Sequence, residues 1–132
     1  MTQLDSQNEF GNAAEELALQ YEVNRLNDTQ KVPQRVSQGD VRAGYDIISF
    51  ESAESKNYDR LIEVKSCSDS VYRFYISTNE LSVAEREGES YYLYLYNRST
   101  QEFTIIQDPY RTIILDNSWT KSSKVLEVYK QS

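Results

Sequence analysis

An acid and an amine placed two residues apart are the first side chains in this sequence that could do chemistry. They are Glu63 and Lys65, in the run Arg60-Leu61-Ile62-Glu63-Val64-Lys65-Ser66. The alternation of apolar and polar residues predicts a strand with Glu63 and Lys65 on one face, about 7 Å apart. A carboxylate there can bind a hard cation, and the ammonium can position a water or stabilise charge on a phosphate. Because Glu and Lys also alternate on ordinary solvated strands, this run alone does not identify a site.

A second acid, Asp46, lies on the preceding predicted strand, residues 44–51. A hairpin between the two strands would place Asp46 beside Glu63, among large apolar neighbours. An acid in such a place is disfavoured unless something compensates it, such as a cation. A divalent ion held by Asp46, Glu63 and the Val64 carbonyl would do so, with Mg²⁺ keeping several of its waters. Glu15, on the first predicted helix, could reach the same site or could be an ordinary acid on a helix face.

Composition excludes several classes of function. The chain has 132 residues, the length of one domain, and a net charge of −7, which argues against coating nucleic acid through bulk positive charge. It contains no histidine, which excludes histidine-based triads and most zinc sites. Cys67 is the single cysteine, so no intramolecular disulfide can form, and a reducing cytoplasm is the expected compartment. No apolar run reaches the roughly 20 residues of a membrane span, so we expect no membrane association.

The elements that must position these residues follow from periodicity and turn signals. Ser6 and Glu9 fit a capping box at the start of a helix over about residues 6–27. The strands predicted next are a short edge strand at 32–37 and three that suggest an antiparallel meander, at 44–51, 58–66 and 71–76.

A second capping box, Ser77 with Glu80, predicts a helix that Gly88 can end. Strands are predicted at 91–96 and 102–106, and Asp108-Pro109 predicts a turn. The apolar runs 113–115 and 125–129 are left without an assignment. We expect a single domain over residues 1–132, with its core at about 8–107.

These motifs together resemble the NO VEIN C-terminal-type domain family, which is placed in the PD-(D/E)XK nuclease-like superfamily. Four ordered segments carry the resemblance: Gly11-Asn12-Ala13-Ala14-Glu15, Gly44-Tyr45-Asp46-Ile47, Ile62-Glu63-Val64-Lys65-Ser66 and Phe74-Tyr75-Ile76-Ser77-Thr78-Asn79-Glu80. The proline of the superfamily's name is absent before Asp46, where Gly44-Tyr45 stands instead.

The resemblance implies an α/β fold with a restriction-endonuclease-like α-β-β-β-α-β core, in which helices flank a central mixed sheet. It implies that Asp46 and Glu63 bind the metal, Mg²⁺ or Mn²⁺, with help from the Val64 carbonyl and Glu15. Lys65 takes the place of the superfamily's lysine. Members of the superfamily cleave phosphodiesters, and this branch often occurs fused to restriction, helicase or anti-phage modules.

Other side chains carry simpler expectations. Glu16 and Glu22 should be solvated, and Cys67 should be a packed thiol. Ser77 and Glu80 should serve as the helix cap, but a hydroxyl or carboxylate at that helix N-terminus could also lie near a phosphate-binding surface. The tyrosines of residues 91–96 should pack in the sheet rather than stack on bases. Ser66 could contact a phosphate or simply end its strand. A local phosphate-contacting patch could form from basic residues, namely Arg35, Arg42, Lys56, Arg60 and Arg73.

The sequence and the resemblance together predict a Mg²⁺-dependent DNA endonuclease of a restriction or anti-phage system. Asp46, Glu63, Lys65 and Glu15 would form its active site. Expected partners are DNA, a fused or associated helicase or DNA-recognition module, and a second copy in a homodimer. The alternative is a module without catalytic activity that keeps the nuclease fold to bind a protein or nucleic-acid partner.

Overall fold

The computed structural model describes residues 3–36, 43–68 and 73–121, with side chains described from Gly11 onward. Within these ranges the chain forms one five-stranded sheet. The elements in chain order are α1 (Gln3–Leu26), β1 (Gln34–Arg35), β2 (Ile47–Ser49), β3 (Arg60–Cys67), α2 (Thr78–Glu87), η1 (Gly88–Ser90), β4 (Tyr91–Asn97), β5 (Glu102–Gln107) and η2 (Tyr110–Ile114). The predicted α/β class and the α-β-β-β-α-β order are therefore confirmed, with β5 added after the core.

The sheet is mixed, and its strands lie in the order β1-β2-β3-β4-β5. β1, β2 and β3 are successively antiparallel, β4 is parallel to β3, and β5 is antiparallel to β4. A parallel pair needs a crossover connection, and the segment that carries α2 supplies it. This crossover returns the chain to the side of β3 that β2 leaves open, and it brings the N-terminus of α2 close to the strand that carries Glu63 and Lys65.

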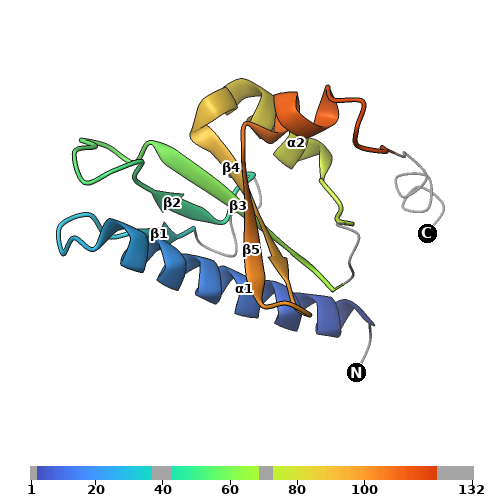
Figure 1. Cartoon of the computed structure of the whole chain (residues 1–132), viewed down its shortest axis with the longest axis horizontal. Coiled ribbons are helices and arrows are strands. Elements are labelled where there is room, and N and C mark those ends of the chain that lie inside the picture. The colour runs from blue at the N-terminus through green and yellow to red at the C-terminus, as the bar shows by residue number, and fades with distance from the viewer. Residues whose placement is uncertain (1–2, 37–42, 69–72, 122–132) are drawn as a thin grey trace.

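Helices cover both faces of the sheet (Figure 1). On one face, Ala14 and Ala18 of α1 pack against a buried cluster made of Ile47, Ile62, Val64, Tyr92 and Tyr94. On the other face, α2 and η2 cover Tyr91, Leu93 and Leu95. The tyrosines of β4 are therefore largely sheet packing, as predicted, since successive side chains of this strand enter two different cores.

The strand predicted at 71–76 is wrong for its described part. Residues 73–77 are extended but unpaired with any strand, and 69–72 lie outside the described residues. Phe74 packs against Trp119 while Tyr75 is 58% exposed, so a loop lying on the protein produces the alternation that suggested a strand. The antiparallel meander instead consists of β1, β2 and β3, because β4 takes the place beside β3.

The predicted start of α1 is wrong, whereas its predicted end and the predicted cap of α2 are correct. α1 begins at Gln3, so Ser6 lies inside the helix and the predicted capping box there is wrong. Its end is correct: Asn27 has a φ of 48°, and its N–H donates to the Val23 carbonyl at 2.9 Å. The capping box of α2 is confirmed, because the side chains of Ser77 and Glu80 each accept from the other's backbone N–H.

The C-terminal part of the fold is a turn followed by a short helix. Asp108 and Pro109 turn the chain as predicted, and η2 is a π-helical turn that contains part of the unassigned run 113–115. The other unassigned run, 125–129, lies outside the described residues. Within the described residues, we find no helix long and apolar enough to cross a membrane.

Candidate active site

Asp46 lies directly before β2, and its carboxylate accepts a hydrogen bond from β3. Its backbone N–H donates to the Ile62 carbonyl at 2.8 Å. Its Oδ2 accepts from the Val64 N–H, also at 2.8 Å. The side chain thus adds a hydrogen bond to the β2–β3 pairing beyond the last paired residue. Since the N–H and C=O of one strand residue point to the same side, the Val64 carbonyl lies on the Asp46 side of β3.

Glu63 and Lys65 project from β3 toward α2, as the period of two predicts. The Lys65 Nζ lies 3.1 Å from Glu63 Oε2 and 2.8 Å from Glu80 Oε1. Glu63 is buried, with 4% of its surface exposed, and a hydrogen bond also joins its carboxyl to that of Glu80. The structure therefore adds Glu80, which the sequence predicts chiefly as a helix cap and does not pair with Lys65. Glu80 is both the cap and a member of this charge cluster, which we name the site cluster: Asp46, Glu63, Lys65 and Glu80.

The site cluster contains three carboxyl groups and one ammonium, and its acids are incompletely compensated. Burial raises the pKa of Asp46 to about 6, against a weaker lowering by the Val64 hydrogen bond. Burial also raises the pKa of Glu63 well above its usual value, and the charges of Asp46 and Glu80 add to this effect. The pKa of Lys65 is raised, since Glu63 and Glu80 outweigh the opposing effect of burial. Strongly shifted acids beside a fixed cation are typical of functional sites.

Glu15 is near this cluster but contacts a different partner. α1 lies on the face of the sheet opposite α2, and the Glu15 carboxylate accepts from Arg35 Nη2 of β1 at 2.8 Å. Its charge still contributes to the raised pKa of Asp46. The structure thus brings Asp46, Glu63 and Lys65 together, while Glu15 lies at the edge of the group in an ion pair.

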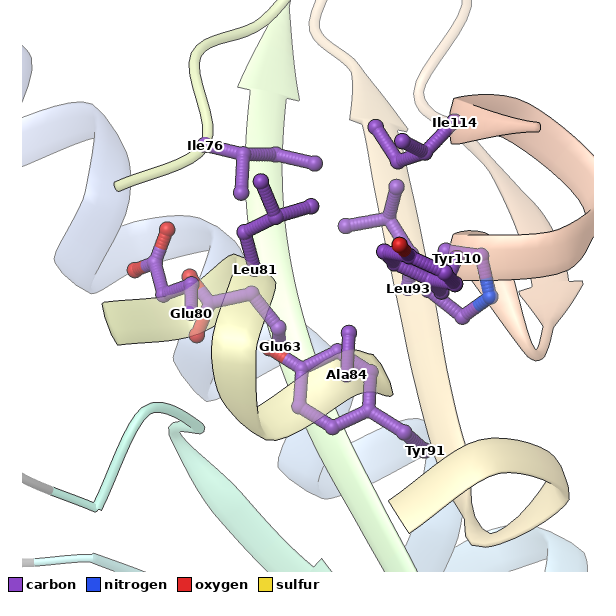
Figure 2. Close-up of a pocket in the computed structure, with 10 residues that line it drawn as sticks. Glu63, Ile76, Glu80, Leu81, Ala84, Tyr91, Leu93, Tyr110 and Ile114 are labelled. Atoms are coloured by element: carbon purple, nitrogen blue, oxygen red, sulfur yellow. The ribbon is translucent and has the colours of Figure 1, made fainter. Parts of the chain in front are cut away.

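A narrow pocket lies beside the site cluster, between α2 and η2. Figure 2 shows Glu63 and Glu80 on one side of it and Tyr110 and Ile114 on the other. Its volume is about 10 Å³, near the minimum for a single water molecule. A nucleobase does not fit there, so any nucleic acid would have to approach the cluster from outside.

The donor chemistry of the site cluster fits a hard divalent cation. Carboxylate and carbonyl oxygens are the ligands that Mg²⁺ takes, and Asp46, Glu63 and the Val64 carbonyl supply them. Within residues 3–36, 43–68 and 73–121 no three acidic, His or Cys side chains form a ready metal-binding group. Mg²⁺ usually binds through one or two carboxylates and keeps several waters, so a pair of acids is sufficient for it.

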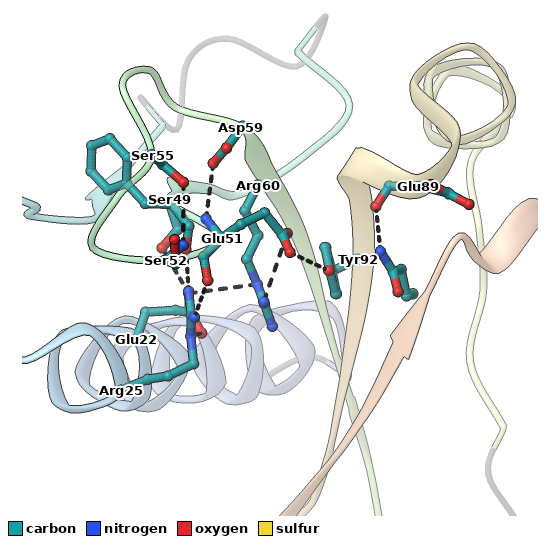
Figure 3. Close-up of polar contacts among 12 residues, drawn as sticks. Glu22, Arg25, Ser49, Glu51, Ser52, Ser55, Asp59, Arg60, Glu89 and Tyr92 are labelled. Carbon is teal, nitrogen blue, oxygen red and sulfur yellow. Dashed lines mark hydrogen bonds and ion pairs between the residues drawn. The ribbon is translucent and has the colours of Figure 1, made fainter.

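A second group of buried charges was not predicted. Glu22 is fully buried, which overturns the expectation that it is solvated, whereas Glu16 is 69% exposed as predicted. Glu22 accepts hydrogen bonds from Arg25 at 2.7 Å, Ser49 at 2.7 Å and Tyr94 at 2.6 Å. Arg60 lies 3.7 Å from the same carboxylate. We call these five residues the Glu22 network; Figure 3 shows how α1 meets the loop after β2 and the start of β3 around it.

The Glu22 network removes Arg60 from the predicted basic patch. Arg60 is 8% exposed and donates to the Tyr94 hydroxyl at 2.6 Å, so it cannot contact a phosphate outside the fold. Arg35 is engaged by Glu15, and Arg42 lies outside the described residues. The sequence did contain a signal for the burial of Glu22. It lies at an interval of four from the apolar residues Ala18 and Leu26, which places the three on one face of the helix, and the structure buries that face.

Two smaller expectations concern the end of β3. The Cys67 side chain is buried, in agreement with a packing role. The Ser66 hydroxyl accepts from Arg98 Nη1 at 2.8 Å, so its described partner is a neighbouring arginine.

Residues 14–106 match the family described as "Protein NO VEIN, C-terminal". The chain belongs to this family. The matched segment of the NO VEIN C-terminal domain runs from α1 into β5 and includes Glu15 and the whole site cluster. Searches of curated proteins and of solved structures found no match.

Proposed function

We propose that this NO VEIN C-terminal domain is a metal-dependent endonuclease of the PD-(D/E)XK superfamily that hydrolyses DNA phosphodiester bonds. The observation that carries the proposal is the convergence of Asp46, Glu63 and Lys65. The pairing of β2 with β3 brings these residues into one partly buried cluster with more negative than positive groups. Excess buried negative charge disfavours the empty site and favours a bound cation.

The residues of the site cluster would divide the work between them. Asp46 and Glu63, with the Val64 carbonyl, would hold Mg²⁺ or Mn²⁺, and Glu15 would assist from the edge. When bound, the ion supplies Lewis-acid polarisation of the phosphoryl group. Lys65 has three N–H donors, two of which are directed to Glu63 and Glu80. The third can donate to the attacking water or to a phosphate oxygen, which places the nucleophile and stabilises negative charge.

The overall charge indicates how DNA would reach the site. At a net charge of −7 the domain repels a polyanion as a whole, so its phosphate contacts have to be local. We therefore infer that a fused or associated helicase or DNA-recognition module delivers the DNA, in a cytoplasmic restriction or anti-phage assembly. A homodimer would place two such sites on the two strands of a duplex.

The test is cleavage of plasmid and single-stranded DNA with Mg²⁺ or Mn²⁺. We expect nicking by the native chain and at least about 100-fold slower nicking by Asp46→Ala and Lys65→Ala, since each removes a group that acts at the reacting phosphate. Glu16→Ala, an exposed change on α1, is the matched control and should cut at the native rate.

The same preparation separates the proposal from the alternative module without catalytic activity. Calorimetric titration with Mn²⁺ should show binding to the native chain and none to Asp46→Ala. Absence of both cleavage and Mn²⁺ binding in the native chain would refute the nuclease proposal and favour the partner-binding module. Binding without cleavage would place the missing component in the DNA-delivering partner.

A further inference from the structure

Glu80 connects the N-terminus of α2 to the lysine of β3 through a single oxygen atom. Its Oε1 accepts from the backbone N–H of Ser77 at 3.0 Å. The same atom accepts from Lys65 Nζ at 2.8 Å. Because the backbone of Ser77 fixes that oxygen, Glu80 provides Lys65 with an anchor that belongs to the rigid start of a helix.

The helix cap alone does not account for an acid at this position. A capping box accepts Gln as well as Glu three residues after the cap, since either side chain can accept from the backbone N–H. Only an ionised carboxylate also forms a charged pair with Lys65, and charge-assisted hydrogen bonds are shorter and stronger than neutral ones. Glu80 is also half-buried, with 20% of its side chain exposed, so solvent screens this pair less than a surface pair.

Glu63 cannot hold Lys65 by itself in a working site. The Lys65 ammonium has two carboxylate partners, Glu63 at 3.1 Å and Glu80 at 2.8 Å. If Glu63 turns its oxygens toward a cation, as the proposed function requires, its hold on Lys65 weakens. Glu80 is the remaining carboxylate that keeps the ammonium beside the site.

We propose that Glu80 is a positioning residue that holds the Lys65 ammonium in place for phosphodiester hydrolysis, with the backbone N–H of Ser77 as its support. This inference rests on the proposed function and deepens it. It assigns a task to a residue outside the acid pair and the lysine.

The experiment compares Glu80→Gln with Ser77→Ala. Glu80→Gln keeps an acceptor for the Ser77 N–H but loses the charged pair with Lys65. Ser77→Ala removes the hydroxyl that accepts from the Glu80 N–H at 3.1 Å and leaves the Lys65 pair intact. We expect Glu80→Gln to lower kcat about 10- to 100-fold with KM for DNA nearly unchanged, since misplacing a catalytic group costs that much. Ser77→Ala should lower Tm while its kcat stays near native.

A second measurement follows Lys65 without using activity. The two variants and the native chain are treated with an amine-reactive methylating reagent, and modification of Lys65 is followed by mass spectrometry. We expect Lys65 to react at least about threefold faster in Glu80→Gln than in Ser77→Ala or the native chain, because an ammonium held in two ion pairs is shielded. Native Lys65 reactivity in Glu80→Gln would overturn the inference.

The outcomes separate this inference from the proposed function. Native kcat in Glu80→Gln, with cleavage abolished by Lys65→Ala, would overturn the role of Glu80 and leave the nuclease standing. An equal loss of kcat in Ser77→Ala would assign the effect to the helix cap and also overturn it. If the native chain neither cuts DNA nor binds Mn²⁺, the proposed function fails, and the reactivity of Lys65 still decides whether Glu80 holds it.

Discussion

Two buried groups of charges lie on opposite faces of the same sheet, and they are compensated in opposite ways. In the Glu22 network, one carboxylate faces two guanidinium groups, Arg25 and Arg60. Burial alone would raise the pKa of Glu22, but the hydrogen bonds from Arg25, Tyr94 and Ser49 bring it below its usual value. In the site cluster, burial raises the pKa values of Asp46 and Glu63, and the single ammonium does not offset it.

This difference is the one that we expect between a structural group of charges and the proposed functional one. The carboxylate of Glu22 is satisfied by groups of the fold itself, so it needs nothing from outside and can be fully buried. The site cluster keeps excess negative charge at a place with 10 Å³ of free space beside it. Burying uncompensated negative charge costs stability, and a bound cation or proton lowers this cost. Acids with shifted pKa values are therefore common at functional sites.

The largest expected effect on stability comes from breaking the Glu22 network. Glu22→Ala leaves the buried Tyr94 hydroxyl without its acceptor, and it leaves Arg60 with only the more exposed carboxylate of Glu51, at 3.7 Å. We expect it to lower the free energy of unfolding by about 3–5 kcal/mol, the usual cost of removing one partner of a buried ion pair. Urea denaturation followed by circular dichroism measures it.

Glu16→Ala is the matched control on the same helix. The ion pair of Glu16 with Arg35 is long, at 3.5 Å, and the Glu16 side chain is 69% exposed. We expect a change within about 0.5 kcal/mol. A loss below about 1 kcal/mol for Glu22→Ala would show that the network is not what holds α1 to the sheet.

Part of this comparison could be predicted from sequence. Asp46, Glu63 and Lys65 are visible because strand periodicity and a hairpin place them together with only local information. Glu80 was visible as a cap, but its second partner, Lys65, lies fifteen residues earlier and is reached only through the crossover. Glu22 was assigned to solvent because its compensating groups, Arg60 and Tyr94, come from distant strands, and the chain alone gives no sign of where they lie.

Removing a carboxylate charge from the site cluster should raise the free energy of unfolding, whereas removing Glu22 should lower it. Asp46 has a pKa of about 6 in the folded chain against an ordinary value of 3.8, so the folded state binds the proton more tightly. Stability contributed by that proton is full below about pH 4 and is lost as pH rises through about 6. Asp46→Asn removes the titration and keeps an acceptor for the Val64 N–H. Above pH 6 it should raise the free energy of unfolding by on the order of 2–3 kcal/mol relative to the native chain.

Thermal and urea unfolding of both proteins across pH 4–8 tests this prediction. The advantage of Asp46→Asn should shrink as pH falls and become small near pH 4, where Asp46 is protonated in the folded state and partly protonated in the unfolded state. Addition of Mg²⁺ at pH 8 should stabilise the native chain and leave Asp46→Asn unchanged, since an ion bound only to the folded state adds stability. A variant less stable than the native chain at pH 8 would mean that Asp46 is already compensated, and the contrast with Glu22 would disappear.

The smallest expected effects come from two tyrosines of β4 that serve the two groups separately. The Tyr94 hydroxyl donates to Glu22 at 2.6 Å, and that of Tyr91 donates to the Gly44 carbonyl at 2.6 Å. Tyr94→Phe removes a hydrogen bond to a charged group and should cost about 1.5–3 kcal/mol, whereas Tyr91→Phe removes a neutral one and should cost about 1 kcal/mol.

Cleavage should rank the two variants in the reverse order. Gly44 lies two residues before Asp46, has a φ of 75°, and would place an added Cβ 2.7 Å from Val83. This close fit, together with the Tyr91 hydroxyl, fixes the backbone that leads to Asp46. Tyr91→Phe should therefore slow cleavage several-fold while Tyr94→Phe leaves it near native, assayed below the Tm of each. If the less stable variant were also the less active, activity would follow global stability, and the two faces of the sheet would not be separate in function.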